Sequence, residues 1–243
     1  MRRTETFSIT GDRTTVTVDT ASGSVEVRAA TSGTLTVNLD TEHPEDWDIS
    51  QLGDLVSVRS PRRRGLRNRA AKMYLEVPPG THVEIAAASA DVSLAGPLGD
   101  VRVRTASGDV RAGTVQSMDA ATASGSVKVD TVLGRLTAST ASGNIKVGAV
   151  GEDVDAGTAS GDVRIGCCQG GTVHVKAVSG NVAVGLPAGI RVEPDIATLS
   201  GKTTLPSPSR TAPPDGPRRT VRVRLRSVSG DITVDRVDAA WGF

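Results

Sequence analysis

Apolar and polar residues alternate with a period of two in short segments on either side of a recurring Ser-Gly pair. The segment 140–147, Thr-Ala-Ser-Gly-Asn-Ile-Lys-Val, is one copy of this unit. Alternation of this kind is typical of a β-strand with one buried face. The pair occurs at Ser22-Gly23, Ser107-Gly108, Ser124-Gly125, Ser142-Gly143, Ser160-Gly161, Ser179-Gly180, Ser200-Gly201 and Ser229-Gly230, with a degenerate copy at Ser89-Ala90.

The apolar positions keep a fixed distance from each glycine. Counted backwards, the seventh, fifth and third residues are apolar or small, as Leu136, Ala138 and Thr140 are in the unit above. Counted forwards, the second and fourth residues are apolar, as Ile145 and Val147 are. The buried row therefore changes phase at the glycine, which permits a bend. Each unit predicts two short strands joined by a corner, with Ser and Thr columns beside it.

The spacing of the units predicts how they assemble. It is 18 residues between Gly125 and Gly143 and again between Gly143 and Gly161, and it lengthens to 29 residues between Gly201 and Gly230. Strands this short cannot bury a face alone, so the repeat predicts coils stacked in parallel, about 4.8 Å apart. The expected fold class is all-β: a single-domain parallel β-solenoid, or β-helix, over residues 1–243, coiled right-handed.

The domain is expected to have four parts in sequence order. Residues 4–80 form opening coils with a basic hairpin loop at 61–69, residues 81–205 form regular coils, residues 206–219 form a Pro-rich loop, and residues 220–243 form the last coil and an aromatic cap. The Pro-rich loop is expected to be an extended surface insertion, with PxxP-type recognition as the alternative.

Aromatic residues, 2% of the chain, lie outside the regular coils. Phe7, Trp47 and Tyr74 come before them, and Trp241 and Phe243 end the chain. A thin core of Val, Ile and Ala has no need of bulky side chains, whereas an open end of a solenoid does. Trp241 and Phe243 are therefore interpreted as a cap over the last coil or, alternatively, as a self-association surface.

Charge and targeting signals narrow the class of protein. The formal net charge of +1 gives no reason to expect binding to nucleic acid. The chain as given has no apolar core of signal-peptide length and no segment of the roughly 20 apolar residues that a membrane span needs, so a cytoplasmic location is expected. The adjacent Cys167 and Cys168 are expected to be free thiols, with a vicinal-thiol redox or metal site as the alternative.

A column of cations is the first candidate site. The third residue after the glycine points outwards, and in four consecutive coils it is Arg111, Lys128, Lys146 and Arg164. Parallel stacking places these side chains one strand spacing apart, where they could bind a linear polyanion or a protein partner. Outward aspartates such as Asp109 favour the alternative of a solvated face whose opposite charges neutralise one another.

The densest run of charge is the second candidate anion surface. Five arginines lie in the eight residues 62–69. They could bind phosphate, anionic lipid or an acidic protein face. The alternative is a solvated loop tip whose like charges discourage edge aggregation, and no aromatic platform for stacking bases accompanies them. The residues are Arg62, Arg63, Arg64, Arg67 and Arg69.

No cofactor, metal or catalytic residue is predicted. The three histidines have no metal-ligand spacing to one another or to a cysteine. The Ser-Gly pairs recur without a base partner, so they are not nucleophile elbows. A carbohydrate-active β-helix enzyme that uses Asp109 with Asp162 or Asp155 is the remote alternative.

The repeated Ala-Ser-Gly-Asp/Asn/Ser-Val/Ile-x-Val/Ile units, with the Val-Pro-Pro-Gly and Leu-Pro-Ala-Gly turns at 77–80 and 186–189, resemble a known family. It is the bacterial toast-rack family, also called putative-adhesin β-strand repeat proteins (domain of unknown function 4097). The resemblance extends from about Phe7 to Val234. It implies a single-stranded β-helix and often a link to envelope stress or membrane-associated systems, as a sensing or adhesion module. It brings no catalytic residues.

The leading hypothesis is a non-enzymatic β-solenoid interaction module whose partner is a protein or an anionic component of the cell envelope. Within the unit 140–147, only Asn144 and Lys146 are expected to face that partner. The alternative is a self-assembling cytosolic β-helix scaffold, a homo-oligomer that polymerises end to end. Neither specific nucleic-acid binding nor a membrane span is expected.

Overall fold

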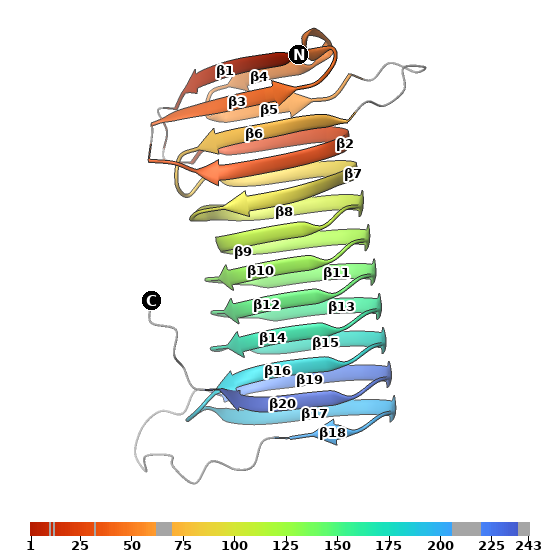
Figure 1. Ribbon diagram of the computed structural model, residues 1–243. Helices are drawn as coiled ribbons and strands as arrows, with labels where there is room; N and C mark the ends of the chain where they lie inside the picture. Colours follow the sequence, from red (N-terminus) through yellow and green to blue (C-terminus); the bar gives the residue numbers. More distant parts are fainter. Residues whose placement is uncertain (10, 12, 32, 62–69, 206–219, 238–243) are drawn as a thin grey trace. The chain divides into compact units, whose positions relative to one another are not determined.

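The computed structural model describes residues 1–9, 11, 13–31, 33–61, 70–205 and 220–237. The chain divides into two compact units, Met1–Gly125 and Ser126–Phe243, each built of short strands over a thin apolar core (Figure 1). The first contains β1 (Arg2–Ser8), β2 (Thr15–Ala29), β3 (Thr34–Asp40), the 3-10 turn η1 (Pro44–Asp46), β4 (Asp48–Leu52), β5 (Leu55–Arg59), β6 (Ala71–Val77), β7 (His82–Ala95), β8 (Leu98–Ser107) and β9 (Val110–Ser124). The second contains β10 (Val127–Val132), β11 (Leu136–Ser142), β12 (Ile145–Val150), β13 (Val154–Ser160), β14 (Val163–Cys168), β15 (Thr172–Ser179), β16 (Val182–Pro187), β17 (Arg191–Ser200), β18 (Thr203–Thr204), β19 (Thr220–Ser229) and β20 (Ile232–Val237).

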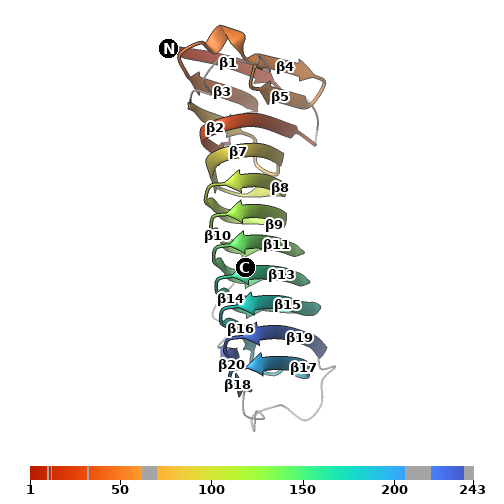
Figure 2. The same ribbon diagram turned by 90° about the vertical axis from the view of Figure 1, so that its right-hand side faces the viewer.

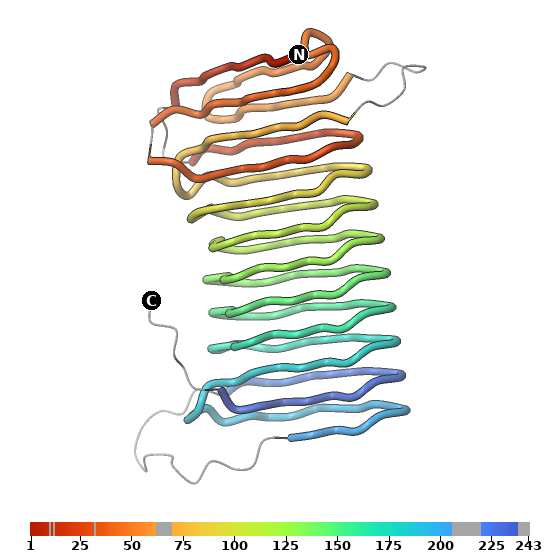
Figure 3. The backbone as a smooth tube through the Cα atoms, in the orientation of Figure 1, coloured from red at the N-terminus to blue at the C-terminus, as the bar shows by residue number. Residues whose placement is uncertain are grey.

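Coils of the second unit follow the predicted repeat. Each has one strand before the corner glycine and one after it, and Figure 3 shows the backbone turning between them. β11 pairs in parallel with β13 and β13 with β15, while β12 pairs with β14 and β14 with β16. Lys146 is opposite Lys128 on one side and Arg164 on the other. The predicted β-solenoid, with strands in parallel register, is confirmed.

The core consists of the side chains that the alternation places inwards. Ala138, Ile145 and Val147 are each 1% exposed. Burying a Val or Ile side chain stabilises by about 1.5–3 kcal/mol, so the stack gains stability as coils are added. Beside the corner, the Thr158 hydroxyl donates to the Gly143 carbonyl of the preceding coil at 3.2 Å.

The corner is held by glycine and by the residue that follows it. Gly161 has a φ of +143°, and a Cβ there would lie 2.0 Å from the Gly143 carbonyl oxygen. Asn144 Oδ1 accepts a hydrogen bond from the Asp162 N–H at 2.8 Å, and Asp162 Oδ1 accepts one from the Asn181 N–H at 2.8 Å. Asn144 is exposed, as predicted, and its Oδ1 also helps to hold two coils together. Contact of Asn144 with a partner stays a prediction.

The coil that comes last in the sequence is not the outermost coil of the second unit. β19 pairs in parallel with both β15 and β17, and β20 pairs with both β16 and β18. Figure 2 shows β19 between β15 and β17. The prediction that coils stack in sequence order is therefore wrong for the coil of β19 and β20. The corners at Gly180, Gly201 and Gly230 are nearly identical, so the repeat itself does not specify which follows which.

The first unit departs from parallel stacking before residue 80. β2 pairs in parallel with β7 along its length, and its two halves pair with β5 and β6. β3 is antiparallel to β6, β1 to β3, and β4 to β5. The parallel stacking expected of the opening coils is wrong for β1 and β3, because alternation specifies the buried face and not the strand direction. β4 lies within 41–80, where the sequence predicts atypical coils.

β5 and β6, the strands before and after the arginine-rich run, are parallel to successive halves of β2. Arg59 is opposite Asp19, and Ala71 is opposite Gly23. The hairpin predicted between these two strands falls on residues that the structure does not describe, so it stays a prediction. Residues 62–69, the Pro-rich segment 206–219 and the aromatic end 238–243 lie outside the described residues.

Candidate functional site

Three members of the predicted cation column are brought together on one sheet of the second unit. Lys128, Lys146 and Arg164 occupy matching positions of β10, β12 and β14, and all three are exposed. With the residues that the structure describes, none of them makes an ion pair. Like charges about one strand spacing, ~4.8 Å, apart destabilise a sheet. The stability of the solenoid therefore does not explain why these three aligned positions are cationic.

Beside Lys146 and Arg164 lies a strip without side chains, whereas the corresponding position beside Lys128 is the exposed Asp130. The next outward positions along β12 and β14 are Gly148 and Gly166. A Cβ at Gly148 would lie 2.4 Å from the Asp130 carbonyl oxygen, and one at Gly166 would lie 2.5 Å from the Gly148 carbonyl oxygen. Close contact between coils thus requires glycine here. The result is exposed backbone beside the cations.

Arg111, the fourth predicted member, belongs to the first unit and has a partner there. It lies on β9 opposite Ser93 of β7. Its guanidinium is 2.7 Å from the Asp109 carboxylate. The neutralisation that outward aspartates suggested is therefore present at Arg111.

The other predicted site residues belong to the arginine-rich run and the aromatic end of the chain. Arg62, Arg63, Arg64, Arg67, Arg69, Trp241 and Phe243 all lie outside the described residues. Their roles as an anion surface and as a cap or self-association surface stay predictions.

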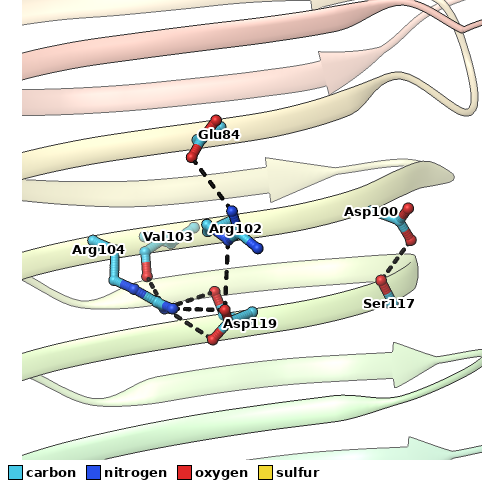
Figure 4. Close-up of polar contacts among 7 residues, drawn as sticks. All are labelled: Glu84, Asp100, Arg102, Val103, Arg104, Ser117 and Asp119. Atoms are coloured by element: carbon cyan, nitrogen blue, oxygen red, sulfur yellow. Dashed lines mark hydrogen bonds and ion pairs between the residues drawn. The ribbon is translucent and has the colours of Figure 1, made fainter.

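A charged cluster of the first unit lies on β7, β8 and β9 (Figure 4). Asp119 accepts hydrogen bonds from both terminal nitrogens of Arg104, at 2.9 and 2.6 Å, and lies 3.5 Å from Arg102. Arg102 is in turn 3.7 Å from Glu84. The Arg104 hydrogen bonds hold the pKa of Asp119 below its usual value despite partial burial. Because every charge here has a partner, the cluster stabilises the sheet and offers little to a ligand.

A Ser-Asp-His row lies beside that cluster, but it is not a catalytic triad. Ser117 donates to the Asp100 carboxylate, and the Asp100 N–H donates to His82 Nδ1 at 3.1 Å. The imidazole contacts Asp100 and not the serine hydroxyl. The arrangement therefore lacks the contact between base and nucleophile that activates a serine.

The three aspartates of the enzyme alternative and the Cys168 thiol also have partners within the chain. Asp155 lies 3.7 Å from His174 Nδ1. Asp162 accepts the Asn181 N–H, and Asp109 is paired with Arg111. Burial raises the pKa of the Cys168 thiol to about 11, and its Sγ donates to the Gly170 carbonyl at 3.2 Å. A thiol with a raised pKa is a poor nucleophile and metal ligand.

No three His, Cys, Asp or Glu side chains among the described residues are grouped so that they could hold a metal ion. In those residues, no helix has the length and apolar character to cross a membrane.

Three outward arginines of β19 were not predicted as site residues. Arg222, Arg224 and Arg226 alternate with the buried Val221 and its successors on β19, a signal that was present in the sequence. Their neighbours could not be foreseen, because β17 lies beside β19 only through the unexpected coil order.

Comparisons with known proteins agree on the fold. A protein named a putative adhesin from Bacteroides fragilis NCTC 9343 superimposes with a TM-score of 0.62 at 12% identity, over 98% of this chain and 97% of that chain. One named a putative lipid binding protein from Parabacteroides distasonis ATCC 8503 has a TM-score of 0.50 at 15% identity, over 97% and 96%. At such identities the likeness establishes the fold alone.

A search of curated proteins finds no match. The family model described as Toastrack DUF4097 matches residues 14–235, which is most of the sequence. The predicted resemblance is thus confirmed, and the chain belongs to the Toastrack DUF4097 family.

Proposed function

We propose that this chain is a non-enzymatic binding module whose cation column binds a linear polyanion of the cell envelope. The cation column is Lys128, Lys146 and Arg164. The observation that carries the proposal is that these exposed like charges stand in register without an acidic partner in the described part of the chain. A bound polyanion would relieve their mutual repulsion.

A linear polymer suits the column better than a single anion. The cations repeat at about 4.8 Å along the stack, so a chain with regularly spaced negative groups meets several of them at once. Gly148 and Gly166 leave room for such a chain beside the cations. Several weak contacts on one polymer add up to useful affinity.

The names of the two structural relatives, an adhesin and a lipid binding protein, agree with a binding role. Self-assembly has less support. β17, the outermost described strand of its sheet, carries Pro194 and three charged side chains, which discourage pairing with another strand. Self-association through Trp241 and Phe243 stays a prediction. Sedimentation of the chain with both replaced by serine tests it, and a monomer before and after would rule it out.

The test reverses two charges of the column. Capture of fluorescent polygalacturonate, a linear chain with one carboxylate per sugar, is measured at about 0.15 M salt. Lys128→Glu with Lys146→Glu should weaken capture by about tenfold or more, equivalent to about 1.4 kcal/mol. The melting temperature should hardly change, because both side chains are exposed.

Lys72→Glu with Lys202→Glu is the matched control, since it changes the net charge equally at two other exposed lysines. It should retain capture. Unaltered capture by the Lys128/Lys146 variant would sink the proposal, as would an equal loss in the control. Capture of polyglutamate with equal preference would point instead to an acidic protein face.

A further inference from the structure

A groove lies on the other sheet of the second unit, where β15, β19 and β17 run side by side (Figure 2). Its volume is about 670 Å³, within the range of sites for small molecules. Thr172 and His174 form one wall, Arg222 and Arg224 lie along the middle, and residues 191–195 form the other wall. Only the insertion of β19 between β15 and β17 brings these residues together.

Two arginines in the groove are oriented by carboxylates of the neighbouring strand. Arg222 Nε donates to Glu193 at 3.4 Å, and Arg224 Nε donates to Asp195 at 3.0 Å. The other oxygen of Asp195 accepts a hydrogen bond from Arg226 at 2.7 Å. Within the described ranges, the terminal nitrogens of Arg222 and Arg224 donate no hydrogen bond. Each guanidinium is thus oriented through its Nε, and its two terminal nitrogens can donate hydrogen bonds to a ligand.

The opposite wall adds polar groups. His174 is 27% exposed, with its Nδ1 3.7 Å from Asp155. Thr172 is opposite Arg222 in the register, and His174 is opposite Arg224. Among the residues that line the groove, the cations Arg191, Arg222 and Arg224 outnumber the carboxylates Glu193 and Asp195 by three to two. The groove therefore favours an anion.

We infer that this groove binds a phosphate monoester. Guanidinium groups bind phosphate through paired N–H donors in one plane. A terminal phosphate has three outer oxygens, which two arginines on one strand can share, whereas a carboxylate is satisfied by one. Pro194, which is exposed and lines the groove, offers an apolar ring that can contact the organic portion of the ester. The site lies on the other sheet from the cation column and does not depend on it.

The test has a soluble arm and a membrane arm. Glycerol phosphate is titrated into the full chain by calorimetry, with glycerol as the neutral control, and co-sedimentation is measured with vesicles that contain phosphatidic acid. Arg222→Gln with Arg224→Gln should weaken binding by about tenfold or more. Lys72→Gln with Lys202→Gln removes the same charge at two exposed lysines outside both proposed sites and should leave binding unchanged. Binding in the vesicle arm alone would identify a lipid headgroup as the source of the phosphate.

Asp195→Asn separates an oriented site from general positive charge. The variant is more cationic, so attraction by net charge alone would tighten binding. If Asp195 positions Arg224, binding should instead weaken severalfold. Tighter binding, an equal loss in both double variants, or no saturable binding in either arm would overturn the inference. Circular dichroism confirms that each variant is folded.

Discussion

The outermost described strands of the two units cover their cores in different ways. In the first unit, β3 has Leu35, Val37 and Leu39 fully buried, and β1 is antiparallel to it. The face of β1 that continues this row carries Phe7, opposite Leu35, and also Arg3 and Glu5, which form an ion pair. Arg3 also donates to the carbonyls of Pro44 and Trp47, at 3.0 and 2.9 Å. The apolar row thus ends in one aromatic side chain and a hydrogen-bonded pair of charges.

In the second unit, the apolar side chains of β19 are more deeply buried than those of the neighbouring β17. Val221, Val223 and Leu225 of β19 are fully buried, whereas Val192 and Ile196 of β17 are only half-buried. Within the described ranges, no strand pairs with the far edge of β17.

The contrast gives a reason for the unexpected coil order. β19 has regular apolar alternation and can be buried between two strands, whereas β17 contains Pro194, which lacks an N–H and suits an edge strand. Placing the coil of β19 and β20 inside and that of β17 and β18 outside therefore buries more apolar surface. In the first unit the edge strand β1 is antiparallel to its neighbour, whereas in the second unit the edge strand β17 is parallel to its neighbour and contains a proline.

Core truncation should give the largest difference between these two regions. Leu39→Ala removes a fully buried side chain and should lower the free energy of unfolding by about 2–5 kcal/mol. Ile196→Ala, at a half-buried position of β17, should cost about 1 kcal/mol. Urea denaturation followed by circular dichroism measures both. Equal losses would mean that the two regions are equally well covered.

Corner glycines give the next largest difference. A Cβ would lie 2.0 Å from a backbone carbonyl oxygen at Gly161 and 2.2 Å from one at Gly201, and φ is positive at both. Gly161→Ala should cost about 1–3 kcal/mol, because coils on both sides fix the backbone. Gly201→Ala should mainly release β18, which hydrogen exchange would detect as local loss of protection. A global loss as large as that of Gly161→Ala would contradict this view of the outermost coil.

The sequence predicts how each coil is built but not how the coils are ordered. Period-two alternation and its distance from the glycine determine that Ile145 faces inwards and Lys146 outwards. The order in which Gly180, Gly230 and Gly201 stack depends on competition between coils of similar shape, which no local pattern records.

The same distinction explains which site residues could be found. Lys128, Lys146 and Arg164 align because they share one offset from consecutive corners. The contacts of Arg222 with Glu193 and of Arg224 with Asp195 join residues of coils exchanged in order, so spacing could not reveal them.

Acid should weaken the charged cluster of the first unit. Hydrogen bonds from Arg104 lower the pKa of Asp119, so its contribution to stability is present above the ordinary pKa of an aspartate and is lost as the pH falls through the lowered value. Asp119→Asn should cost about 0.5–1 kcal/mol at pH 7. The difference from the wild type should shrink below about pH 4. Urea denaturation at several pH values measures it, and a constant difference would exclude the ion pair as its cause.

The smallest effect is expected at Leu199, on the outermost described coil. Its side chain is 85% exposed, in contrast to the buried leucines of β3. Leu199→Ser removes little buried apolar surface and should change the free energy of unfolding by less than about 0.5 kcal/mol. Leu225→Ser, on the adjacent β19, is the matched change at a fully buried position and should be strongly destabilising. Urea denaturation of the two variants compares them directly. A loss above about 1 kcal/mol for Leu199→Ser would mean that this coil is covered in solution, because truncating an exposed side chain has no other route to a cost of that size.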